Sequence, residues 1–195
     1  MLSPRSRAFM KKFLPTTIAL LLLTISAFPQ AKSNDAITKQ IKKLNTEKSI
    51  TVSYDGNTSK VMAVAENFGD RDVSKVGVQA MNFAMGFFYA GDSLKEAPDP
   101  IMLTFWILSK KPRFADVHNV TFIVGSENLV YDNIRYAAKA REDMEYINCK
   151  ITRTDLEKMV NGQDVRVKLG EAEFKLLPQQ VRLMSQVLDI SNTDL

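Results

Sequence analysis

Alternation of apolar and polar residues predicts most of the secondary structure of this chain. A period of two over a short segment is typical of a strand with one buried face. Two such segments flank the turn Asp55-Gly56-Asn57, which is a strong β-hairpin signal. Residues 125–128 and Gly170 separate two further pairs of segments. The predicted strands are 50–54, 60–66, 76–90, 101–108, 120–124, 129–136, 145–152, 164–170 and 173–177.

Two of these strands have unusual patterns. In residues 76–90, the odd positions from Met81 to Tyr89 are bulky, whereas the even positions from Ala80 to Gly86 are small. This pattern predicts a strand whose small face is closely covered. Residues 101–108 are apolar on both faces, as expected of a strand in the middle of a sheet or sandwich.

Helical signals occur at three places. Residues 34–45 place apolar side chains at helical spacing, and residues 154–157 (Thr-Asp-Leu-Glu) form a capping-box pattern that predicts a second helix. Pro178 predicts the start of a last helix, because proline is favoured at the first helical position. No strand–helix–strand alternation occurs, which argues against a parallel sheet. The sequence therefore predicts a mainly β (β-rich α+β) fold, an antiparallel β-sandwich or partly closed barrel with two or three peripheral helices.

The C-terminal region combines a strand at 165–170 (VRVKLG) with a strand-to-helix turn at 173–181 (EFKLLPQQV). Over about the last fifty residues, this pattern resembles that of small uncharacterised exported bacterial β-domain proteins. The resemblance implies a type of fold and no activity.

The N-terminal segment has the parts of a secretory signal peptide. Four basic residues precede an apolar stretch that runs from Phe13 to about Phe28. This stretch is shorter than the ~20 apolar residues that span a bilayer, and polar residues interrupt it. We therefore expect cleavage after Ala27 or Ala31 and no stable membrane anchor afterwards. Met10, followed by two lysines, is an alternative start to Met1.

Cleavage changes the electrostatic balance. The whole chain has 26 Lys and Arg against 22 Asp and Glu, a net charge of +4. Four of the basic residues and none of the acidic ones lie in residues 1–31, so residues 32–195 carry no net charge. This balance argues against a nucleic-acid partner, since such partners require a basic surface. We expect residues 32–195 to form a single β-rich domain, exported to the periplasm or secreted.

Candidate catalytic chemistry depends on one histidine. Asp116 and His118 would share a face of an extended segment, so they are the only candidates for a hydrolase that uses histidine as its base. However, they lie in a polar connection, and the Gly-x-Ser-x-Gly pattern of a nucleophile elbow is absent from the sequence. We expect an exposed histidine beside an aspartate and predict no catalytic site.

The single cysteine and the acidic residues give weaker signals. Cys149 alternates with Ile147 and Ile151, which predicts a buried and unreactive thiol. One histidine and one cysteine are too few for a structural zinc site, and residues 67–72 lack the acidic ladder of a calcium loop. The sequence predicts neither a metal nor a cofactor.

Met and aromatic residues are concentrated in residues 81–88 and 101–106. Such residues fill a sandwich core, and they also line pockets for apolar ligands. Our leading interpretation is an exported, non-enzymatic binding module for a protein or envelope component. The alternatives are a carrier that holds an apolar ligand inside a small barrel, and a hydrolase that uses Asp116 and His118.

Overall fold

The computed structural model describes residues 31–44, 49–65, 67–68, 70–139 and 143–192. Except for Ala31, the predicted signal peptide lies outside the described residues. Within these ranges, none of the helices is long and apolar enough to cross a membrane.

The larger sheet contains six antiparallel strands in the order β2-β3-β4-β6-β10-β9. Its strands are β2 (Ile50–Tyr54), β3 (Thr58–Val64), β4 (Ala80–Ala90), β6 (Ile101–Leu108), β10 (Met144–Ile151) and β9 (Arg135–Lys139). β4 and β6 pair at its centre, where Phe83 lies opposite Phe105. The predicted central position of residues 101–108 is therefore confirmed.

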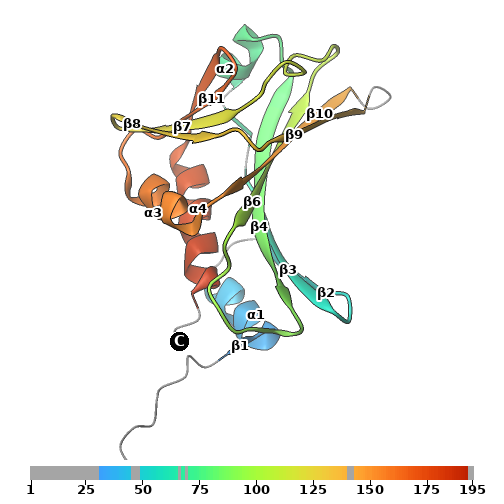
Figure 1. Cartoon of the computed structure of the whole chain (residues 1–195), viewed down its shortest axis with the longest axis vertical. Helices are drawn as coiled ribbons and strands as arrows, with labels where there is room; N and C mark the ends of the chain where they lie inside the picture. The colour runs from blue at the N-terminus through green and yellow to red at the C-terminus, as the bar shows by residue number, and fades with distance from the viewer. Residues whose placement is uncertain (1–30, 45–48, 66, 69, 140–142, 193–195) are drawn as a thin grey trace, which may run out of the picture.

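The smaller sheet has four antiparallel strands in the order β12-β11-β7-β8. Its strands are β12 (Ala172–Lys175), β11 (Arg166–Leu169), β7 (Val120–Val124) and β8 (Glu127–Tyr131). Its strands run across one end of the larger sheet (Figure 1). A third, two-stranded pairing joins β1 (Lys32–Ser33) to β5 (Ser93–Leu94).

Four helices lie within the described residues: α1 (Asn34–Lys43), α2 (Asp70–Lys75), α3 (Arg153–Asn161) and α4 (Pro178–Ser191). The Ser33 hydroxyl caps α1 by accepting a hydrogen bond from the backbone N–H of Ala36. Pro178 begins α4, as predicted. α1, α3 and α4 all lie on the same side of the larger sheet (Figure 1).

Aromatic side chains connect the two sheets through the core. From the larger sheet, Phe83 and Phe105 lie edge to face, with ring centroids 6.3 Å apart. Phe122 of β7 lies 6.5 Å from Phe105. Phe68 lies between the sheets, 6.1 Å from Phe83 and 5.7 Å from Phe174 of β12. The core therefore lies between the sheets and is completed by apolar residues of the helices.

The predicted fold class is confirmed, with two corrections of detail. The two sheets are antiparallel and the described residues form no closed barrel. The described ranges contain four helices rather than two or three, because residues 70–75 form the short α2 where the polar composition predicts an irregular connection. The predicted strand 129–136 is two strands: β8 ends at Tyr131, and β9 begins at Arg135 in the other sheet.

The start of α3 is also corrected. The predicted capping box places the N-terminus at Thr154, but the N-cap is Thr152, whose hydroxyl accepts a hydrogen bond from the Asp155 N–H at 3.1 Å. Both threonines have a carboxylate residue three positions later, so the local pattern fits either one. The end of β10 at Ile151 decides between them, since the helix follows the strand at once.

Candidate functional site

The two candidate catalytic residues lie in the connection between β6 and β7. Asp116 and His118 are both exposed, and neither side chain makes a hydrogen bond or ion pair with any residue that the structure describes. A histidine that acts as a general base needs a nucleophile within hydrogen-bond reach and a group that orients it. In the described part of the chain, this arrangement is not assembled around His118.

An open pocket of about 540 Å³ lies beside Asp116. It is lined by Val76, Arg113, Phe114, Asp116, Val117, Leu169, Gly170, Glu171 and Ala172. None of these residues has a hydroxyl or thiol nucleophile, and His118 does not line the pocket. The lining of this pocket therefore lacks the serine or cysteine nucleophile that a histidine base would activate.

Glu145 is the polar residue that holds this connection in place. Its carboxylate is 2% exposed and accepts hydrogen bonds from the backbone N–H groups of Arg113 and Phe114, each at 2.9 Å. The hydroxyls of Ser109 and Tyr136 donate to the same carboxylate at 2.6 and 3.1 Å. With its oxygens occupied by four donors, Glu145 anchors the connection between β6 and β7.

Sequence reasoning missed Glu145, although the pattern contained a signal. It has the same parity along β10 as Ile147, Cys149 and Ile151, which places its side chain on the inward face. Tyr136, which donates to Glu145, is affected in turn. Burial, with the nearby charge of Glu145 and the hydrogen bond to it, raises the pKa of Tyr136 to about 12.

Cys149 lies in the core, as predicted. The residue is 1% exposed, and burial raises the pKa of its thiol to about 12. A thiol in such surroundings stays protonated near neutrality and is a poor nucleophile and metal ligand. Throughout the described ranges, no group of three or more His, Cys, Asp or Glu side chains could hold a metal ion.

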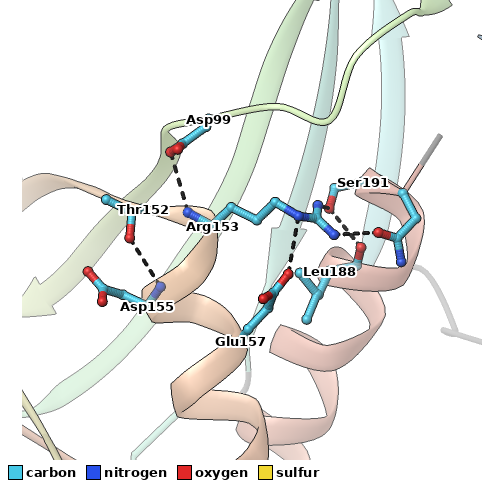
Figure 2. A network of polar contacts seen from close by, with 8 residues as sticks. Asp99, Thr152, Arg153, Asp155, Glu157, Leu188 and Ser191 are labelled. Atoms are coloured by element: carbon cyan, nitrogen blue, oxygen red, sulfur yellow. Dashed lines mark hydrogen bonds and ion pairs between the residues drawn. The ribbon is translucent and has the colours of Figure 1, made fainter.

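A polar network ties α3 to the end of α4 (Figure 2). The Arg153 guanidinium donates to the Ser191 hydroxyl and to the Asn192 side-chain oxygen, and it lies 3.3 Å from Glu157. From the other side, the ammonium of Lys32 donates to the carbonyls of Ile190 and Asn192, each at 3.0 Å. Two cations thus complement the negative end of the helix dipole, which is a structural role.

The face of the larger sheet that points away from the helices has a different composition. We call it the outer face. Its outward positions alternate with the inward ones that belong to the core, such as Met81, Phe83 and Phe105. Eight apolar side chains occupy it, namely Met62, Val64, Phe88, Met102, Trp106, Leu108, Met144 and Tyr146. Phe88 is 51% exposed and the others are partly exposed.

Small residues lie at the centre of the outer face, along β4. Ala84 is 2% exposed, so the small face of this strand is covered as predicted. The cover comes from larger neighbours, since Met62 and Met102 flank Gly86 on the adjacent strands. At Gly86 a Cβ atom would lie 2.1 Å from the Val61 carbonyl oxygen, so only glycine fits there.

The charges of the outer face have one sign. Its outward strand positions carry Lys60, Arg135, Lys139 and Lys150, and these positions include no Asp or Glu. The ammonium groups of Lys60 and Lys139 lie 5.6 Å from the ring centroids of Phe88 and Tyr146. The outer face therefore combines apolar side chains with cations, and the uncharged polar side chains of Asn82, Thr104 and Asn148 also lie on it.

An open pocket of about 520 Å³ adjoins one end of the outer face. Phe88, Met102 and Lys150 line it from the sheet, and residues 93–100 line it from the connection that follows β4. This connection contributes the carboxylates of Glu96 and Asp99, so the positive character of the surface diminishes at this end.

Comparison with family models, curated proteins and solved structures finds no significant match to this chain.

Proposed function

We propose that this protein is a non-enzymatic binding module that is exported to the periplasm or secreted, and that its binding surface is the outer face. The observation that carries the proposal is the partial exposure of large apolar side chains, Phe88 and Trp106 among them, on one face of the sheet. Exposed apolar side chains gathered on one surface often mark an interaction site. The surrounding cations give the surface a polar rim, as in protein interfaces.

The two alternative functions have less support. A carrier would need an enclosed apolar cavity, but the described residues form two open sheets, and both pockets described above are open to solvent. A hydrolase would need a nucleophile next to His118, whose side chain is exposed and makes no hydrogen bond among the described residues.

An anionic apolar dye, 8-anilino-1-naphthalenesulfonate, tests the surface directly. We expect saturable binding to the folded protein, accompanied by quenching of Trp106, the only tryptophan in the chain. Met62→Glu places a carboxylate on the outer face and should weaken binding. Val130→Glu is the matched control, because Val130 is 52% exposed on the four-stranded sheet, and this variant should bind as the native protein does.

Circular dichroism of each variant establishes that the dye reports a folded surface and not a partly unfolded state. Dye binding that is absent, or that is unaffected by Met62→Glu, would contradict the outer face as the binding surface. Export is tested separately by intact-mass analysis of protein from an exporting host. We expect a mature N-terminus between residues 28 and 32, and retention of residues 10–31 in a membrane fraction would contradict it.

A further inference from the structure

We infer that the outer face binds an acidic amphipathic helix of a partner protein. This inference rests on the proposed function and adds the chemistry of the partner. It follows from three features of the outer face, which are the sign of its charges, the polarity of the hairpin beside it and the dimensions of the face itself.

The sign of the charges selects an anionic partner and excludes a second copy of this chain. Lys60, Arg135 and Lys150 occupy outward strand positions that include no carboxylate. Two outer faces packed against each other would bring cations against cations, and like charges at an interface disfavour association. A partner with Glu and Asp beside its apolar residues would instead pair with these cations.

The adjacent hairpin argues for a protein segment over a lipid surface. The β2–β3 hairpin extends from the edge of the sheet on the side away from α1, α3 and α4 (Figure 1). Its tip is Asp55-Gly56-Asn57, and the exposed Asp55 carboxylate accepts hydrogen bonds from the N–H groups of Asn57 and Thr58. Tyr54 beside this tip is 49% exposed, but its hydroxyl donates a hydrogen bond to the Gly56 carbonyl at 2.6 Å. A bilayer that covers the outer face would also meet the tip, where an anionic surface would repel the Asp55 carboxylate, whereas a helix that lies along β6 does not have to reach the tip.

The dimensions of the outer face fit a helix. From Met102 to Leu108 along β6 the outward residues span roughly 20 Å, and the four strands from β3 to β10 span roughly 15 Å. A helix of three to four turns is roughly 20 Å long and about 10 Å wide, and it satisfies its own backbone hydrogen bonds. An extended segment on this face would leave its backbone groups without partners, because the strands of the sheet already pair with one another.

Trp106 makes the test specific to this surface, since it is the only tryptophan in the chain and occupies an outward position of β6 on the outer face. The probes are two synthetic helical peptides of about 15 residues without tryptophan, identical in their leucines but carrying either glutamates or lysines on the polar face. We expect the acidic peptide to shift the Trp106 emission to shorter wavelength with a saturable titration, and the basic peptide to leave it unchanged. Added salt should weaken binding.

Charge reversal sharpens the test. The double variant Lys60→Glu, Lys150→Glu should bind the acidic peptide at least about tenfold more weakly. The control is Lys168→Glu with Arg182→Glu, two exposed positions on β11 and α4 that make the same change in net charge away from the outer face. This control should bind as the native protein does.

Three outcomes would overturn the inference. The first is equal binding of the acidic and basic peptides. The second is an emission shift with anionic phosphatidylglycerol vesicles but not with the acidic peptide, which would identify a lipid surface as the partner. The third is no response to the acidic peptide while the dye still binds and Met62→Glu still weakens dye binding. This outcome would support the outer face as a binding surface but would contradict an acidic helix as its partner. If the native protein does not bind the dye, the proposed function itself is contradicted.

Discussion

The two faces of the six-stranded sheet both carry large apolar side chains, but they differ in their polar residues and in what covers them. On the inward face, Phe83 and Phe105 are at most 2% exposed and contact residues of the smaller sheet and the helices. On the outer face, Trp106 and Met102 occupy the neighbouring positions of the same strand, yet they remain partly exposed. Alternation along a strand assigns residues to faces, but it does not show whether a second layer covers each face.

This difference changes the meaning of the residues rich in Met and aromatic side chains. The sequence left open whether these residues fill a core or line a pocket, and the structure places some of them in the core and others at the surface. Met81, Phe83 and Met85 are core residues, whereas Phe88 and Met102 line an open pocket at the surface. Flexible methionine on an exposed surface favours binding to partners of variable shape.

The largest expected difference between the two faces is in thiol reactivity. Cys149 points inward, and burial raises its pKa to about 12, so the native protein should react with a thiol reagent on the order of a thousandfold more slowly than the denatured protein. Lys150→Cys in a Cys149→Ala background places the thiol on the outer face and should react at the rate of a free thiol. If the thiol of the folded native protein and that of the folded Lys150→Cys, Cys149→Ala variant react at equal rates, the assignment of the faces is contradicted.

Truncating a side chain to alanine is expected to lower the free energy of unfolding more on the inward face than on the outer face. Phe105→Ala removes a buried ring and should lower the free energy of unfolding by about 3–5 kcal/mol. Trp106→Ala, one residue later on the same strand, should lower it by about 1 kcal/mol or less. Urea denaturation followed by circular dichroism measures both, and similar losses would show that Trp106 is also part of a packed core.

Removing a polar side chain should also lower the free energy of unfolding more on the inward face than on the outer face, although by less than removing a buried ring. Glu145→Ala leaves the N–H groups of Arg113 and Phe114 buried without an acceptor, so it should cost about 3 kcal/mol. Asn148→Ala removes the outward acceptor of the Thr104 hydroxyl and should cost less than about 1 kcal/mol, because water can replace it. Equal costs in urea denaturation would contradict an anchoring role for Glu145.

The smallest effect is expected outside the sheet, at His118. His118→Ala changes an exposed side chain that has no hydrogen bond among the described residues, so the free energy of unfolding should change by less than about 0.5 kcal/mol. The native protein and the variant should both be inactive in a screen of esterase, peptidase and glycosidase substrates. An activity that the native protein has and His118→Ala lacks would support the hydrolase instead.

The sequence predicted those elements that are determined by a few neighbouring residues. The hairpin at Asp55-Gly56-Asn57, the helix that begins at Pro178 and the inward position of Cys149 are all confirmed. These features depend on turn chemistry, helix starts and alternation, each of which is encoded locally.

The remaining features depend on contacts between distant segments. The break between β8 and β9 sends two consecutive strands into different sheets. Asp132 and Asn133 favour a turn at this point, but they do not indicate that the next strand joins the other sheet. The burial of Glu145 requires donors from residues 109–114, which are remote in the sequence. The exposure of the outer face follows from the side on which the helices pack, and the alternation of β4 and β6 reflects it only in the polar residues Asn82 and Thr104 at outward positions.

The contact of Lys32 with the end of α4 has a consequence for the order of assembly. Its ammonium is bonded to the carbonyl of Ile190, 158 residues away along the chain, and burial lowers the pKa of this lysine while Asp189 opposes the shift. Because contacts of such long separation carry a high entropic cost of loop closure, they form late in folding. A chain that emerges from its N-terminus cannot complete this contact until α4 has been made, so β1 is joined to α4 only after the rest of the domain has been synthesised.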